Sequence, residues 1–146
     1  WLTGEFGTVR RSGDRSRRWK PLGTSYEGTF FGTLPLAKGG AVVFGLRGNI
    51  FRSEDGKAWK QVESPTQSLL HGGLALADER LVLPAAAGQL LVSADEGRSF
   101  RLAAWPGAAS ATATSLWQAA DGGVLLTSDK GVHRLELADL KMEAAK

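Results

Sequence analysis

The chain has 146 residues, of which 42% are hydrophobic and 23% are charged, and it contains no cysteine. This composition is typical of globular domains, and it excludes disulfides and thiolate metal sites. No apolar run reaches the length of about 18 residues that a membrane-spanning helix needs. The net charge of +3 is concentrated near the N-terminus, since residues 1–20 carry +4 and the rest of the chain sums to −1.

One short pattern occurs three times, at intervals of about 40 residues, over residues 12–19, 53–59 and 93–100. Each copy, called a box here, reads Ser-x-Asp, then a turn residue, then an aromatic residue. A repeat of this period indicates an array of small structural units. The residues that define the boxes are Ser12, Asp14 and Trp19; Ser53, Asp55, Gly56 and Trp59; and Ser93, Asp95, Gly97 and Phe100.

The second unit shows the elements of one repeat in chain order. Short apolar runs at 29–34, 41–45, 50–53 and 59–62 predict four strands, and Gly-rich turns and the box separate them. No segment has a sustained helical period, although residues 136–146 would suit a short terminal helix or a frayed tail. Four antiparallel strands in about 40 residues are typical of one blade of a β-propeller.

We therefore predict an all-β fold, a partial β-propeller of about three and a half four-stranded antiparallel blades. The chain forms a single propeller fragment over residues 1–146. It is expected to start inside the second strand of a blade and to end soon after the third strand of the fourth unit. The predicted blade repeats are about 1–22, 26–63, 67–104 and 113–138, followed by a tail at 139–146.

The box residues have a structural interpretation. An Asp side chain accepts hydrogen bonds from backbone N–H groups a few residues ahead, and Ser does so more weakly. Gly56 and Gly97 suit the left-handed backbone of a tight turn. Ser16 replaces this glycine in the first box, which predicts a looser turn. The aromatic residue that ends each box is expected to pack against the neighbouring blade.

Five arginines surround the first box, and two interpretations of them stay open. They would bind an anion or an acidic peptide, because Arg binds carboxylates through paired hydrogen bonds. Alternatively, they form a solvated edge whose charges deter pairing with other strands. Nucleic-acid binding is disfavoured because the basic segment is short and no binding motif accompanies it. The residues are Arg10, Arg11, Arg15, Arg17 and Arg18.

The boxes resemble the Asp-box, or BNR, repeat. Residues 1–12 read Trp-x-x-Gly-x-x-Gly-x-aliphatic-x-x-Ser and lead into the first box. This pattern resembles the blade of the photosystem II stability/assembly factor family. The resemblance implies a propeller, seven-bladed in plastid and cyanobacterial members, with an arginine-rich surface that contacts a client protein. It also implies an exported, periplasmic location for a bacterial relative.

On this basis we expect a non-catalytic scaffold that binds a client protein in the assembly or stability of a membrane-associated complex. It would contact such a complex without inserting into the membrane, and it would need no cofactor. Because family members are longer, the chain is expected to be the C-terminal half of a propeller. Alternatively, two copies would close a seven-bladed ring as a homodimer.

Asp-box propellers also include sialidases and other glycosidases, so a glycan-binding or glycan-cleaving propeller is the alternative function. Tyr26 and Glu27 are adjacent and so would point apart on a strand, which suits a sialidase poorly. The box aspartates are committed to turns, which leaves no clear carboxylate pair for hydrolysis. His71 and His133 are interpreted as packed or partly buried positions, and they lack the carboxylates of a metal site.

Overall fold

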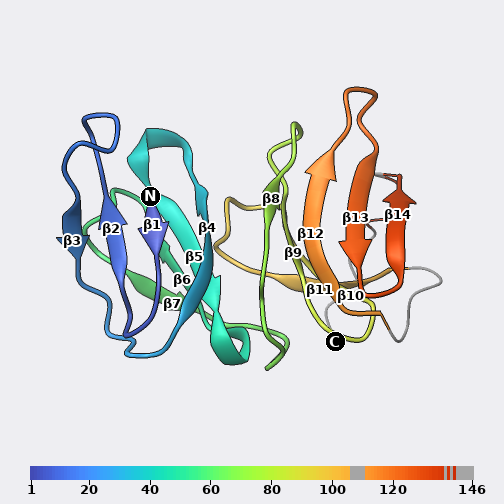
Figure 1. The fold of residues 1–146 in the computed structure, drawn as a ribbon, viewed down its shortest axis with the longest axis horizontal. Helices are drawn as coiled ribbons and strands as arrows, with labels where there is room; N and C mark the ends of the chain where they lie inside the picture. The colour runs from blue at the N-terminus through green and yellow to red at the C-terminus, as the bar shows by residue number, and fades with distance from the viewer. Residues whose placement is uncertain (106–110, 137, 139, 141–146) are drawn as a thin grey trace.

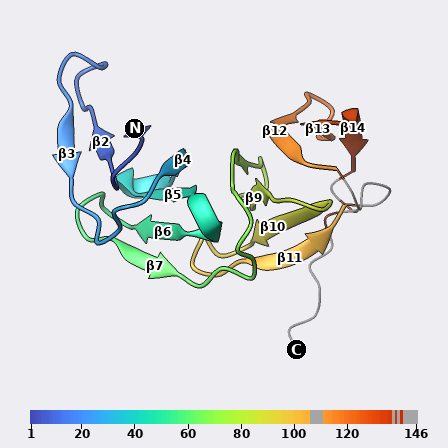
Figure 2. The ribbon, with the colours of Figure 1, turned by 60° about the horizontal axis from the view of Figure 1, so that its bottom comes forward.

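The computed structural model describes residues 1–105, 111–136, 138 and 140. These residues form four antiparallel sheets that follow one another along the chain in a curved row (Figures 1 and 2). Within each sheet, neighbouring strands in the chain are also neighbours in space. Within the described ranges, no helix is long and apolar enough to cross a membrane.

The first sheet contains β1 (Leu2–Thr3), β2 (Val9–Arg11) and β3 (Lys20–Leu22). The second contains β4 (Phe30–Pro35), β5 (Ala41–Gly45), β6 (Ile50–Ser53) and β7 (Lys60–Val62), with the 3-10 turns η1 (Ala37–Gly39) and η2 (Leu46–Gly48) between strands. The third contains β8 (Leu74–Ala75), β9 (Leu81–Pro84), β10 (Gln89–Ser93) and β11 (Arg101–Ala104). The fourth contains β12 (Ala113–Gln118), β13 (Val124–Ser128) and β14 (Gly131–Leu135).

Successive sheets pack face to face, and three hydrophobic cores fill the spaces between them. Val9 of the first sheet packs with Val43 and Phe51 of the second. The opposite face of the second sheet packs on the third, and the third packs on the fourth. The middle strand β5 is therefore buried along its whole length, which explains its uninterrupted apolar sequence. This succession of antiparallel sheets, four-stranded in the second and third and three-stranded in the first and fourth, confirms the predicted partial propeller fold.

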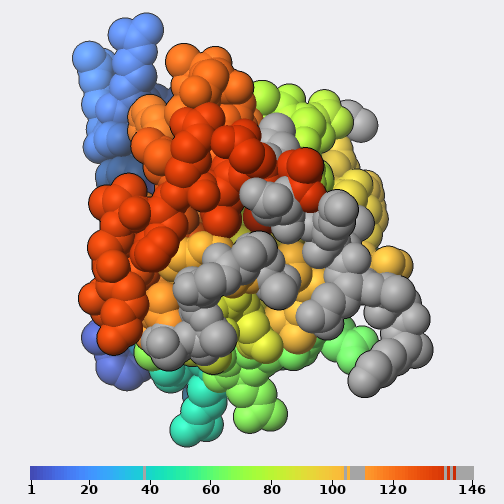
Figure 3. All heavy atoms as spheres, turned by 90° about the vertical axis from the view of Figure 1, so that its right-hand side faces the viewer, coloured from blue at the N-terminus to red at the C-terminus, as the bar shows by residue number. Residues whose placement is uncertain are grey.

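The row of sheets is open, as expected for a partial propeller. Leu34 and Leu74 each lie two residues before the first hairpin of their sheet, and both pack into the core shared with the next sheet. Trp117 holds the same place before the hairpin of the fourth sheet and is 69% exposed. Figure 3 looks at the molecule from this end, where the strands of the fourth sheet lie at the surface.

The structure contradicts one expectation about a histidine and does not test another about the C-terminus. His71 was expected to be packed or partly buried, which is wrong, because the side chain is exposed. The reason is that the inner strand β8 begins only at Leu74, so His71 precedes the strand and its ring lies 5.3 Å from the ring of Phe31. The proposed terminal helix or tail at 136–146 lies almost entirely outside the described residues.

Candidate functional site

The three boxes form turns built by the same local hydrogen bonds. In each box the Ser hydroxyl contacts the Asp carboxylate, and the Asp Oδ1 accepts a backbone N–H further along the turn. The Ser Oγ also accepts the N–H of the residue at the turn, at 2.9 Å for Ser16, 2.8 Å for Gly56 and 2.8 Å for Gly97. The Ser hydroxyl of each box thus links the Asp side chain to the backbone at the turn.

These bonds lower the pKa of all three box carboxyls. The backbone N–H of Arg18 is the main cause for Asp14, and that of Lys57 is the main cause for Asp55. Partial burial works against the shift at Asp95, but hydrogen bonds from within the turn outweigh it and the pKa is still lowered. The box carboxylates are therefore ionised and committed to their turns.

The first turn has the same geometry as the third, despite the missing glycine. Ser16 adopts φ 64° and Gly97 adopts φ 78°, both in the left-handed region. The preceding residues, Arg15 and Glu96, are left-handed too, at 56° and 58°. Replacing glycine by serine has therefore not changed the path of the turn, and its effect is backbone strain at Ser16.

The structure separates the five arginines of the predicted basic site. Arg10 and Arg11 are neighbours on β2 and so point to opposite faces of the first sheet. Arg15 and Arg17 are exposed in the box turn, and Arg18 forms an ion pair with Asp14 at 3.0 Å. The five side chains therefore do not form a single cluster, and their role in binding stays a prediction.

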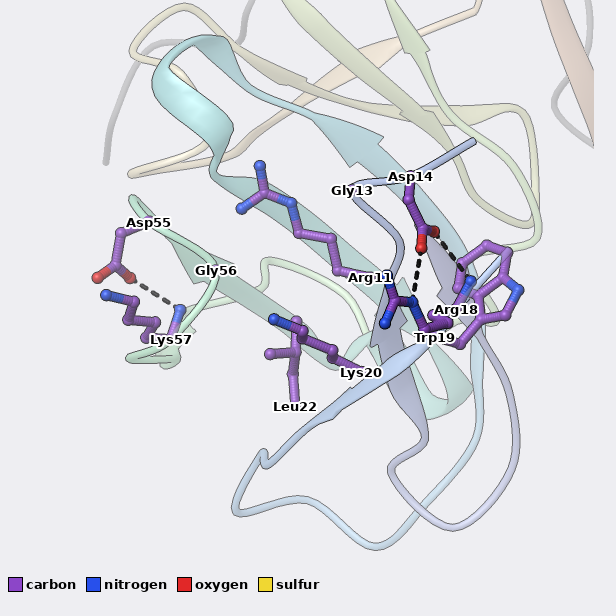
Figure 4. A pocket seen from close by; sticks show the side chains of 10 residues that line it. All are labelled: Arg11, Gly13, Asp14, Arg18, Trp19, Lys20, Leu22, Asp55, Gly56 and Lys57. Carbon is purple, nitrogen blue, oxygen red and sulfur yellow. Dashed lines mark hydrogen bonds and ion pairs between the residues drawn. The ribbon is translucent and has the colours of Figure 1, made fainter. Parts of the chain in front are cut away.

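Arg11 and Arg18 line a groove of about 860 Å³ between the first sheet and the box turn of the second, called groove 1 here (Figure 4). The guanidinium of Arg11 lies 5.1 Å from the centre of the Trp1 ring, a cation–π contact. Four cations and two carboxylates line the groove, and both carboxylates belong to boxes. The charged lining residues are Arg11, Arg18, Lys20, Lys57, Asp14 and Asp55.

The corresponding space between the second sheet and the third box is called groove 2, and its volume is about 540 Å³. Arg52 is its central cation and its side chain is only 10% exposed. It contacts Glu54 at 3.0 Å and Glu96 at 3.6 Å, and its Nε donates to the backbone oxygen of Glu96 at 2.8 Å. Arg98 contacts the same two carboxylates at 3.6 and 3.0 Å. Groove 2 is thus a closed network of charges.

Arg11 occupies in groove 1 the place that Arg52 occupies in groove 2. Each is the last residue before its box serine, and each pairs across to a lysine on the next strand. Arg134 lies on the matching strand of the fourth sheet and contacts Glu136, two residues further on, at 2.9 Å. Arg52 likewise has Glu54 two residues further on.

At the corresponding position after Arg11 the chain has Gly13. The structure gives Arg11 no ion pair among the described residues. Sequence reasoning found Arg11 but missed Trp1, Lys20 and Lys57. A comparison of the repeats would have indicated the groove, because the second unit reads Arg-x-Glu where the first reads Arg-x-Gly.

The other candidate positions form no site. Tyr26 lies in the loop between the first two sheets, where its hydroxyl donates to the Leu46 carbonyl oxygen and accepts from Asn49. His133 is half-buried against the Trp105 ring, with ring centres 4.7 Å apart. In the part of the chain that is described, no group of three or more His, Asp or Glu side chains is arranged to hold a metal ion.

Two solved structures share this fold. A structure of YCF48 bound to a D1 peptide is 14% identical, with a TM-score of 0.67, and the match covers 94% of this chain and 46% of that one. The crystal structure of the extracellular domain of BT4673 from B. thetaiotaomicron is 12% identical, with a TM-score of 0.70, and covers 96% of this chain and 20% of that one.

The chain therefore spans less than half the length of either structure that it matches. The match to YCF48 agrees in fold with the resemblance found in residues 1–12. At these identities the likeness shows the propeller fold. No protein-family model and no curated protein matches the sequence.

Proposed function

We propose that this propeller binds a client protein through arginines on and beside its first box. Arg10, Arg11, Arg15 and Arg17 are together called the basic surface here. The observation that carries the proposal is the imbalance of charge there. Arg10, Arg15 and Arg17 are exposed, and no ion pair is formed by them or by Arg11 among the described residues. Of the six arginines elsewhere in the described chain, four contact carboxylates and two, Arg47 and Arg101, form no ion pair; the four are Arg52, Arg80, Arg98 and Arg134. Exposed arginines on a rigid scaffold suit an acidic protein segment.

The similarity to YCF48 bound to a D1 peptide supports a protein client over other ligands. We extend the proposal to a role in assembling or stabilising a membrane-associated complex, from outside the membrane. The likeness to an extracellular domain supports an exported protein, with the periplasm as the expected compartment. Both extensions come from similarity in fold.

The role proposed is non-catalytic and needs no cofactor or metal. Support comes from the carboxylates, since the three box aspartates are bound within turns and Glu54 is bound to Arg52. A general acid or nucleophile must be free to approach a substrate. The Tyr26 hydroxyl is occupied by backbone and side-chain partners within the loop region.

The test is to capture clients from an extract of the source cells, with the 146-residue chain immobilised. One variant changes Arg10, Arg11, Arg15 and Arg17 to Glu. A matched control changes four exposed cations of the later sheets to Glu, namely Arg47, Lys60, Arg101 and Lys130. Wild type and control should retain the same client, and the first variant should lose it.

Circular dichroism must show that both variants are folded, and the client must then bind the purified chain in calorimetry. Equal recovery of the client by the two variants would refute the basic surface as its binding site. A client that is captured but does not bind the purified chain would refute direct binding.

A further inference from the structure

The two grooves have cations at two equivalent positions but differ in the carboxylates beside them. In groove 2, Arg52 and Arg98 both contact Glu54 and Glu96. Groove 1 has Arg11 in place of Arg52. It also has Lys57 in place of Arg98, since each follows the glycine of its box, Gly56 or Gly97.

The two carboxylates that Arg52 and Arg98 contact in groove 2, Glu54 and Glu96, have no counterpart in groove 1. The position of Glu54, two residues after the arginine, is held by Gly13. Glu96 is the extra residue of the third box, and the second box is one residue shorter and lacks it. The loss of two acidic groups with retention of both cations leaves groove 1 with a surplus of positive charge.

Groove 1 is also shaped to hold its cation in place. The Arg11 guanidinium rests on the Trp1 ring and lies close to two turns of the second sheet. A Cβ atom added at Gly39 would lie 2.9 Å from Arg11 Nη2, and one at Gly56 would lie 3.4 Å from Nη1. A cation held in a defined position loses little conformational freedom when it binds an anion.

We propose that groove 1 is an acceptor site for neighbouring acidic side chains of a partner polypeptide, whose carboxylates take the places that Glu54 and Glu96 occupy in groove 2. One carboxylate bridges Arg11 and Lys57, as Glu54 bridges Arg52 and Arg98. This inference rests on the proposed function and adds to it the chemical class of the bound segment. It also singles out Arg11 from the five arginines.

The test places the missing carboxylate back into groove 1. The substitution Gly13→Glu recreates the Arg-x-Glu sequence of the second unit. Gly13 tolerates a side chain, because an added Cβ meets no atom within 4 Å and its φ is not left-handed. The new glutamate would neutralise Arg11 from within and compete with the ligand. Gly13→Gln is the matched control, equal in size but uncharged.

The probe is a fluorescent peptide of six glutamates with an amidated C-terminus, titrated by anisotropy at low salt. Gly13→Glu should weaken binding about tenfold, because losing one charge-assisted pair costs roughly a factor of ten in affinity. Gly13→Gln adds no charge, so its affinity should stay within about twofold of wild type. Arg11→Gln should match the effect of Gly13→Glu. Equal affinity of Gly13→Glu and wild type would overturn the proposal.

A second peptide tests whether groove 1 binds side-chain carboxylates or the C-terminal carboxylate of a chain. A peptide of six alanines with a free C-terminal carboxylate should bind at least about tenfold more weakly than the glutamate peptide. If it binds as tightly and responds equally to Gly13→Glu, the ligand is a terminus and the assignment to acidic side chains is wrong.

The two proposals fail in different ways. If no client depends on the basic surface but the glutamate peptide responds to Gly13→Glu, the acceptor site stands and the client-binding function is wrong. If the four-arginine variant loses a client, but Gly13→Glu weakens the binding of neither that client nor the peptide, the client-binding function stands and groove 1 is not its site.

Discussion

Groove 1 and groove 2 occupy equivalent places in the repeat, yet one is open and the other is closed. Groove 2 is lined by three cations and three carboxylates, and groove 1 by four cations and two carboxylates. The difference lies at positions that the box signature does not include, namely Gly13 against Glu54 and the extra residue Glu96. Repeats that share a fold can thus differ in the charge that they present through one or two positions beside the signature.

The comparison also shows two uses of the same arginine. Arg52 is nearly buried, makes its contacts within the chain and connects two sheets. Arg11 rests on the Trp1 ring and forms no ion pair with any residue that the structure describes. The first use contributes to stability, and the second is the one that the proposed acceptor site requires.

The largest expected effect is on stability, when each of the two arginines is replaced by alanine. Arg52→Ala should lower the free energy of unfolding by about 2 kcal/mol, because it removes charge-assisted hydrogen bonds and leaves Glu54 and Glu96 with Arg98 as their shared cation. Arg11→Ala should cost only about 0.5 kcal/mol, the contribution of an exposed cation–π contact. Urea unfolding followed by circular dichroism measures both. Equal losses would show that Arg11 is a structural residue like Arg52.

A smaller effect concerns the strain in the first box. Ser16→Gly should stabilise the chain by roughly 0.5–1 kcal/mol, because glycine adopts a left-handed φ without steric cost. Ser115→Gly, at an exposed strand position on β12, is the control and should destabilise instead. Thermal unfolding of both variants checks the prediction. A loss of stability in Ser16→Gly would mean that its side chain makes a compensating contact.

The smallest expected effect is the pH dependence of the stability that Glu54 contributes in groove 2. Hydrogen bonding and charge from Arg52 hold the pKa of Glu54 below its usual value of 4.5. Its stabilising contribution is therefore complete above pH 4.5 and is lost as the pH falls through the lower pKa of the folded state. The effect is small because Glu54 is exposed.

Urea midpoints at pH 6 and pH 3 for wild type and Glu54→Gln measure this contribution. The difference between the two proteins should be smaller at pH 3 than at pH 6, since the charge-dependent contribution of Glu54 is lost progressively as the pH falls below 4.5. The contribution of Asp14, which forms its ion pair with Arg18 away from Glu54, cancels in this comparison. A difference that is the same at both pH values would show that Glu54 does not act through its charge.

Much of the fold could be predicted from the sequence. The period of about 40 residues and the short apolar runs identified the propeller, because strands and tight turns depend on local patterns. The predicted strands at 41–45 and 50–53 coincide with β5 and β6. The inner strand of the third sheet was less predictable, because the two glycines after His71 delay its start.

The sequence by itself determined the repeat, the turns and the surplus of positive charge near the N-terminus. Only the tertiary structure decided which of these charges act together. Arg10 and Arg11 are adjacent in the chain but on opposite faces of β2, whereas Arg11 and Lys57 are far apart in the chain and line one groove. The physical reason is that strand alternation separates neighbours, and face-to-face packing of sheets brings distant residues together.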